Sequence, residues 1–517
     1  MENSDFVDIQ QDDIPGAIRY RGNVRLLHDG VRMNCNTAYL FQKENYVLAF
    51  GDVKMNQGDT VFMDSKYAEY RGNTKFAFAT GNVVMRDPKM TLTTDTINFD
   101  RRIQEAYYTT YGTIKDQENT LRSKSGRYYL DQKKFQFLTA VTITNPKYVI
   151  KSNHLDYYSN SGHSYLFGPS TITSKENFIY TEKGFYDTKK NFAHFVKNSY
   201  IKYNNRLIEG DSLYYDRNRE FASATRRVKV TDSINKSIAR GHYAEVYRNQ
   251  DSLMMTGRAY TATLVEKDTL YMHGKKMLVT GKPESRVVRA FPNVRFYKID
   301  LSGKCDSLHS SEKTGITKLI GRPVLWNGEN QLTGDVMHLI SNTQTEKLDS
   351  LKVLNNAFIA SKDTLGKGYN QVKGVNLYGK FRDNKLYEVD LVKNTEKIYF
   401  AYDKGELAAI DKGVSSAIKL ELEDNKINII TSFKNIQSDS YPEKELPENA
   451  RKLRGFIWRG DEMITKMEDI FPPEEQLYHE KQEEAGAIDD AKKPVPMEPR
   501  KETLEYDKNN PSQKKTQ

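Results

Sequence analysis

The residues of this 517-residue chain that most resemble a catalytic set are the serine of "GDSL" at 210–213 and the Asp-x-x-His of "DSLH" at 306–309. A serine nucleophile needs a base that a third group orients, so Ser212 with Asp306 and His309 would suit hydrolysis. Asp-Ser-Leu, however, recurs at 211, 251, 306 and 349. A repeated structural element explains this recurrence better, and we keep a GDSL-type hydrolase only as the less favoured alternative.

The other reactive side chains give no stronger signal. The nine histidines are scattered without a His-Glu-x-x-His motif, so we expect no metal site. Two cysteines are too few for a disulfide framework or a zinc ribbon, and we expect two isolated thiols. Several carboxylates stand where strands are predicted to end, a position at which aspartate forms turns: Asp100, Asp131, Asp187 and Asp216. We therefore expect no enzyme activity, no metal and no cofactor.

Composition indicates exposed β-sheet rather than a helical enzyme. Apolar residues make up 38% of the chain, the mean hydropathy is -0.73, and there are 33 tyrosines. The net charge of +9 favours an anionic partner, which could be nucleic acid, a membrane surface or a phosphorylated ligand. Aromatic and basic residues alternate in "AHFVKNSYIKYNN", as base stacking would require. An amphipathic strand explains the same alternation, so we expect no nucleic-acid partner.

The ends of the chain differ from its body. No window of 18 residues is free of charge, and "MENSDFVDIQ" lacks the apolar stretch of a secretion signal. The repeat pattern is already present by Arg19 without a preceding cap, so we expect that the start is truncated. Beyond "FPPEEQ" the composition predicts disorder.

Repeats of about 30 residues determine the expected architecture. Glycines followed by Asn, Asp or Thr and then Val or Ile stand at 22, 51, 81 and 112, and a degraded series continues at Ala140, Gly168, Asn198 and Gly257. A second series, such as "DTINFD" and "GDSLYYD", places apolar residues two apart, which is strand periodicity. Each repeat thus predicts two strands, with a bulge at the glycine. The fold class is all-β, an elongated curled sheet with one apolar face turned inward.

The repeats also divide the chain. We expect an N-terminal lead at 1–17, the β-repeat region at 18–281, a more divergent continuation or second β module at 282–436, an extension with a short helix at 437–472, and a disordered charged tail at 473–517. The boundary near 282 rests on "KPESRVVRAFPNVRFYKIDLSG", which lacks the motif.

The inward face provides the candidate binding site. If the sheet stays open, its apolar side chains would line a trough for acyl chains, and if it closes they would form an ordinary core. The pattern does not decide between the two. The expected lining residues are Leu48, Phe50, Phe76, Phe78, Val83, Ile97, Phe99, Tyr128, Leu130, Phe135, Phe137, Leu155, Tyr157, Leu213 and Tyr215. A basic rim of Lys54, Arg86, Lys202 and Arg217 would meet phosphate groups.

"AFGDVKMNQGD", "ATGNVVMRD" and "IEGDSLYYDRNREFASA" resemble the OstA/LptA superfamily of lipopolysaccharide-transport proteins, which includes the N-terminal domain of LptD. The likeness spans about 18–432, and the length is similar to that of the long OstA-like proteins of the Bacteroidetes type. The resemblance implies an open β-jellyroll, or β-taco, that shields lipid A acyl chains in the periplasm or at the outer membrane. It also implies end-to-end docking with itself, with LptC-like inner-membrane partners and with LptD-like outer-membrane partners. A β-solenoid glycan-binding or structural scaffold is the alternative.

Overall fold

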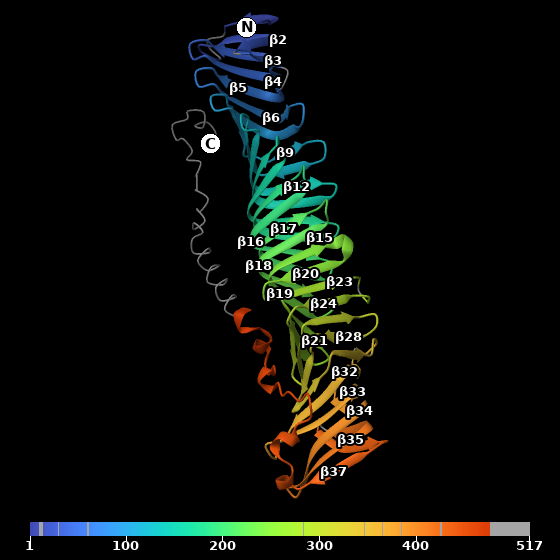
Figure 1. Ribbon diagram of the computed structural model, residues 1–517. Helices are drawn as coiled ribbons and strands as arrows, with labels where there is room; N and C mark the ends of the chain where they lie inside the picture. Colours follow the sequence, from blue (N-terminus) through green and yellow to red (C-terminus); the bar gives the residue numbers. More distant parts are fainter. Residues whose placement is uncertain are drawn as a thin grey trace.

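The protein is an elongated, gently curved rod of β-structure with its N-terminus at one end (Figure 1). The computed structural model describes residues 1–9, 14–28, 30–58, 61–282, 284–345, 347–363, 365–383, 385–423 and 426–475. Within these residues it contains 37 strands, all in one antiparallel sheet, and five short 3-10 helices. The predicted elongated all-β fold is confirmed.

The N-terminal part of the sheet runs from β1 to β11. Its strands are β1 (Phe6–Asp8), β2 (Ile18–His28), β3 (Val31–Phe41), β4 (Tyr46–Gln57), β5 (Val61–Arg71), β6 (Phe76–Arg86), β7 (Thr91–Asp100), β8 (Glu105–Tyr108), β9 (Gly112–Lys115), β10 (Thr120–Ser123) and β11 (Ser125–Tyr129). The central part runs through β12 (Lys134–Asn145), β13 (Tyr148–Tyr158), β14 (His163–Ser174), β15 (Asn177–Asp187), β16 (Phe192–Tyr203), β17 (Arg206–Asp216), β18 (Phe221–Asp232) and β19 (Ser237–Tyr247).

Shorter strands follow the 3-10 helix η1 (Arg248–Gln250). They are β20 (Ser252–Thr256), β21 (Tyr260–Val265), β22 (Asp268–His273), β23 (Lys276–Thr280), β24 (Val287–Phe291), β25 (Val294–Lys298), β26 (Leu301–Cys305), β27 (Ser307–Ser311), β28 (Ile316–Ile320), β29 (Val324–Asn327), β30 (Asn330–Thr333) and β31 (Val336–Ser341). The C-terminal part contains β32 (Leu348–Lys362), β33 (Tyr369–Arg382), β34 (Lys385–Asp403), β35 (Glu406–Glu423), β36 (Lys426–Phe433) and β37 (Gln437–Tyr441), then η2 (Glu443–Glu445), η3 (Glu448–Arg451), η4 (Gly460–Glu462) and η5 (Met467–Ile470).

Many of the long strands bend near their middle, where consecutive residues adopt left-handed backbone angles. Gly51 and Asp52 have φ of 72° and 44° in β4, and Gly81 and Asn82 have φ of 86° and 55° in β6. Glycine adopts this conformation without steric cost, and Asn or Asp tolerates it better than most residues. The pairing register of both strands shifts at these residues. The predicted bulge at the glycine is therefore confirmed there.

The later repeats of the degraded series keep the bend, with glycine at two of the four positions. Ala140, Gly168, Asn198 and Gly257 all have positive φ, at 54°, 77°, 50° and 71°. The repeat at Gly112 differs, because the left-handed residue there is its neighbour Tyr111. The degraded series thus marks the same structural feature as the first glycines.

In several intervening strands a buried side chain bonds across the bend. The Ser152 hydroxyl donates to the carbonyl of His154, and the Thr181 hydroxyl to that of Lys183, both at 2.9 Å. In β3 the Cys35 thiol takes this place, 3.4 Å from a backbone oxygen. Burial raises the pKa of Cys35 to about 11. Both cysteines are free, as predicted, and the structure shows that both are buried.

The bend divides the sheet into two facing walls. Wall 1 ends in a row of turns that includes 42–45, 72–75, 101–104 and 130–133, which we name lip 1. Wall 2 ends in a row that includes 87–90, 116–119 and 146–147, which we name lip 2. The interior between the walls holds two apolar clusters, one formed by residues of 20–166 and the other by residues of 179–420.

The sheet continues across the expected boundary at 282. Here the strands are interrupted at the bend rather than bulged, as at Pro292 and Asn293 between β24 and β25. Wall 1 continues as β20, β23, β24, β27, β28 and β31, wall 2 as β21, β22, β25, β26, β29 and β30, and both rejoin at β32. The interruption explains why the motif is missing from 282–303.

After β37 the chain turns back and lies along the outer face of wall 2 as an extended strap, residues 442–475, seen in red in Figure 1. The Gln371 side chain accepts from the Leu453 amide and donates to the Arg451 carbonyl, each at 2.9 Å. Hydrogen bonds and charge from Arg459, and then from Lys304, lower the pKa of Glu462 to about 2. The segment 460–471, expected to form one short helix, forms two short 3-10 helices, η4 and η5. The predicted disordered tail lies, from residue 476, outside the described residues.

Candidate functional site

A cavity of about 530 Å³ lies between the two walls in the N-terminal part of the rod. Its lining comes from β2 to β8, β11 and the adjoining turns. Wall 1 contributes mainly Val47, Tyr70, Ala77, Phe99 and Leu130. The volume is within the range of about 300–1,000 Å³ that is usual for ligand pockets.

Four methionines of wall 2, on four neighbouring strands, point into the cavity. Met33 pairs with Met55, Met55 with Met63, and Met63 with Met85. All four line the cavity, and we call them the methionine row. In register further along the sheet the row continues as Leu92, Ile114, Leu121, Ile143, Ile150, Ile172, Ile179, Ile201 and Ile208. Four consecutive methionines therefore occur in this row only beside the cavity, and a single one, Met272, follows much further along the same register.

Wall 1 carries small side chains beside the bend in the same region. Ala38, Ala49, Ala68 and Ala79 are cross-strand partners on four successive strands, and we call them the alanine row. In the central part most residues at the same inward position are larger, in the order Phe137, Leu155, Leu166, Gly184, Phe195 and Leu213, before Ala224 and Ala244 follow. The strands keep one backbone plan while the size of the inward side chain changes, so the interior has more free space at the N-terminal end.

An aromatic cluster closes the inner end of the cavity. The rings of Tyr128 and Phe135 stack at 4.1 Å, and those of Phe135 and Phe137 at 5.8 Å. Tyr108 shares a 2.6 Å hydrogen bond with Ser123, and burial raises the pKa of both Tyr108 and Tyr128 to about 12. We name Tyr108, Tyr128, Phe135 and Phe137 the aromatic plug. The space left among these four side chains is about 10 Å³.

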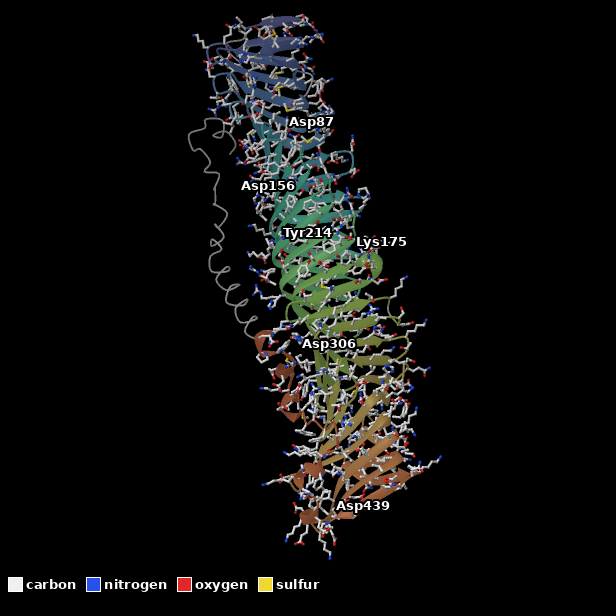
Figure 2. All side chains as sticks on the ribbon, in the orientation of Figure 1. Asp87, Asp156, Lys175, Tyr214, Asp306 and Asp439 are labelled. Carbon is white, nitrogen blue, oxygen red and sulfur yellow. The ribbon has the colours of Figure 1, made fainter. Side chains whose placement is uncertain are left out.

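Polar side chains gather where the cavity meets the two lips. Arg101, Gln104, Asp131 and Lys133 approach from lip 1, and Asp87 and Lys89 from lip 2. Backbone hydrogen bonds of 3.0 Å join successive turns of lip 1, from Arg101 to Lys75, from Leu130 to Gln104 and from Ser159 to Lys133. The site therefore combines an apolar interior with a charged and well-supported mouth. Figure 2 labels Asp87 on lip 2 and Lys175 further along the same edge of the rod.

Four of the fifteen predicted apolar residues turn their side chains to the cavity: Ile97, Phe99, Tyr128 and Leu130. Phe78 also belongs to the lining, but it alternates with the inward Ala77 and Ala79, and its ring packs on that of Tyr67 at 6.4 Å on the outer face of wall 1. Seven others lie in the interior away from it or beyond the plug. Of these, Val83, Phe135, Phe137, Leu155 and Leu213 are at most 3% exposed, and Tyr157 and Tyr215 are partly buried. These residues build the closed part of the interior.

Leu48, Phe50 and Phe76 lie on the outer face of wall 1, so their expected inward orientation is wrong. Val47 packs on the interior cluster, Ala49 belongs to it, and Phe50 is 39% exposed. Two alternating sets of residues exist in every strand, and larger hydrophobic size does not determine which set faces inward. Here the smaller set does.

The four predicted basic residues do not line the cavity. Lys54 and Arg86 lie on the outer face of wall 2, where Arg86 pairs with Asp64 at 2.5 Å. The Lys202 ammonium lies 5.5 Å from the ring centre of Tyr200. Arg217 belongs to a lip 1 turn further along the rod.

The predicted hydrolase set is not assembled. Ser212 lies on β17, which pairs with β16 and β18, whereas His309 lies on β27, which pairs with β24 and β28. The Ser212 hydroxyl is instead 2.6 Å from Nε2 of His194 on the exposed face of the sheet. The aspartates at strand ends act as turn formers, since Asp187 Oδ1 accepts from the amides of Lys189 and Lys190.

Two further features are absent from the described residues. No group of three or more His, Cys, Asp or Glu side chains there could hold a metal ion. Nor does that part of the chain contain a helix long and apolar enough to span a membrane.

Sequence reasoning missed the methionine row. A signal was present, because Met55 and Met85 each stand four residues after a repeat glycine, at Gly51 and Gly81. The groove lining was assigned mainly to aromatic residues instead, because each of them contributes more apolar area.

Comparison with known proteins places this cavity in a family context. Residues 1–153 match the family model described as OstA-like protein. Among solved structures, LptH from Pseudomonas aeruginosa, described as the LptA-homologous periplasmic component of the lipopolysaccharide transport device, matches 28% of this chain and 95% of its own. The identity is 14% and the TM-score 0.21, a likeness that carries no argument about function. No curated protein matches the chain. The N-terminal 153 residues, which supply all but Ser159 and Asn160 of the cavity lining, are thus an OstA-like region.

Proposed function

We propose that this protein is a carrier for lipopolysaccharide-type lipids and holds acyl chains in the cavity of its N-terminal third. The observation that supports this function is a cavity lined by the methionine row and apolar wall 1 residues, set inside the OstA-like region. Each methylene that moves from water into such a site contributes about 0.8 kcal/mol. Methionine side chains adapt to ligands of varied shape, which suits acyl chains of different length.

The protein would act without catalysis, in the periplasm between the inner and outer membranes. The OstA-like match favours this location. The walls shield the acyl chains while the sugar and phosphate groups stay at the lips in water. The predicted catalytic set has no support in the geometry, since Ser212 lies on β17, His309 on β27 and Asp306 between β26 and β27.

The aromatic plug limits how the lipid moves. Movement through near-equivalent sites along the whole rod would need free interior space beyond Phe135, and that interior is filled by Phe137, Leu155 and Leu166. We propose instead that the lipid is held at the N-terminal end and handed over there.

Partners would join the ends of the sheet through strand addition. At the C-terminal end, β36 exposes Ile429 and Phe433 by 46% and 44%. At the N-terminal end, the three-residue β1 covers only part of β2. LptC-like and LptD-like jellyroll partners, or a second copy of this chain, would offer edge strands whose unpaired backbone groups can hydrogen-bond to these strands.

The function is tested by placing a charge in the methionine row. Purified protein is incubated with lipid A, and bound lipid is measured by native mass spectrometry. Met63→Glu should lower the affinity about 10-fold or more, because the carboxylate would be buried among apolar groups without a partner. Met254→Glu is the matched control, since Met254 precedes the buried Met255 in β20 and faces outward.

Circular dichroism establishes that both variants are folded. Lipid binding by folded Met63→Glu at the wild-type level, or equal loss in Met254→Glu, would show that the cavity is not the lipid site.

A further inference from the structure

The mouth of the cavity carries a set of cations that the sequence did not single out. Lys89 stands in the β6–β7 turn on lip 2, Arg101 in the β7–β8 turn on lip 1, and Lys133 in the β11–β12 turn on lip 1. All three line the same cavity. They therefore approach one opening from both sides.

The two cations of lip 1 stand on adjacent, stacked turns. The Leu130 amide donates to the Gln104 carbonyl at 3.0 Å, which joins the turn of Arg101 to that of Lys133. Nη1 of Arg101 donates to the Tyr70 hydroxyl at 3.2 Å, and Gln104 Nε2 donates to the Arg101 carbonyl at 2.7 Å. The guanidinium is thus held at the mouth by a side chain of wall 1.

Two carboxylates share the mouth with these cations. Asp87 Oδ1 accepts from the amides of Lys89 and Met90, at 2.7 and 2.9 Å, so this carboxylate closes its own turn. Asp131 is the other acid of the lining. The mouth thus carries three cationic side chains and two acidic ones, and one of the acids also closes its own turn. A net positive charge results at the place where the apolar interior ends.

We propose that Lys89, Arg101 and Lys133 form a two-sided clamp that binds the phosphate headgroup of an amphiphile whose acyl chain occupies the cavity. The inference rests on the proposed function and adds to it the residues that bind the phosphate group. Arg and Lys are the side chains that recognise phosphate oxygens, and cations on opposite lips can contact different oxygens of one group. The apolar chain and the phosphate would be bound together, so free phosphate alone would bind weakly.

The clamp is tested with two probes that share a chain and differ in headgroup, dodecyl phosphate and dodecyl maltoside. Both are titrated calorimetrically below their micelle concentrations at low salt. Wild-type protein should bind the phosphate probe about 10-fold more tightly, and this preference should shrink as salt screens the charges. Lys89→Gln/Lys133→Gln should bring the two affinities to within about twofold of each other, while the affinity for the maltoside probe stays unchanged.

The controls separate the clamp from the general charge of the protein. Lys54→Gln/Lys66→Gln removes two exposed lysines that do not line the cavity and should keep the wild-type preference. Arg101→Lys keeps the charge at the mouth and should retain most of the preference. Inorganic phosphate at the probe concentration should not displace dodecyl phosphate.

Each opposite result overturns a specific statement. An unchanged preference in Lys89→Gln/Lys133→Gln, or an equal loss in the Lys54/Lys66 control, would refute the clamp. Displacement by inorganic phosphate would show a free-anion site instead. If wild-type protein bound neither probe, the proposed function itself would fail, and the clamp with it.

Discussion

The N-terminal and central parts of the rod share one backbone plan and differ in their interiors. Around the cavity, the inward position before the bend is alanine on four successive strands, and the opposite wall carries four methionines. In the central part these rows contain Phe137, Leu155 and Leu166 on one wall and isoleucines on the other. The cavity thus coincides with the stretch in which one row is alanine and the other methionine, without a change of fold.

The largest effect should come from the residue that closes the cavity. Phe137→Ala should lower the free energy of unfolding by about 3–5 kcal/mol, because a fully buried ring is replaced by a void next to the existing cavity. Phe50→Ala, on the outer face, should cost about 1 kcal/mol. Denaturant unfolding measures both. A similar cost for the two changes would mean that the plug is not a packed interior element.

The sequence predicted some features of the interior and not others. Strand periodicity and the glycine series indicated the repeats, the bends and the inward face, because these follow from backbone geometry. Periodicity could not show whether the interior is open, since the same apolar residue lines a cavity or fills it depending on what stands opposite. Ile97 borders the cavity, for example, while Leu155 at an equivalent inward position is fully buried.

The face assignment failed for a related reason. In β4, Tyr46, Leu48 and Phe50 form one alternating set and Val47 and Ala49 the other, and both sets are apolar. The larger set lies outside, where Phe50 packs against neighbouring rings at 4.8 and 5.7 Å. Cross-strand aromatic pairs stabilise an exposed sheet face, so size alone could not identify the interior.

A smaller effect is expected when the methionine row is given the side chains of the central part. Replacing Met33, Met55, Met63 and Met85 together by Ile should change the free energy of unfolding by less than about 1.5 kcal/mol per site, because volume is nearly conserved. β-branched side chains are stiffer at χ1, so the site should accept fewer ligand shapes. Affinity for a kinked unsaturated fatty acid should fall more than affinity for the straight saturated chain of equal length, as measured by probe displacement. Equal loss for both ligands would show that methionine adaptability is not what the row provides.

The central claim is that acyl chains bind only at the N-terminal end of the rod. A diazirine-bearing fatty acid bound to the full chain and cross-linked by light would report this directly when the labelled peptides are sequenced by mass spectrometry. We predict labels on the methionine row and on lining residues such as Tyr70 and Phe99. Labels on Leu155, Leu166 or Leu213, beyond the aromatic plug, would contradict the account.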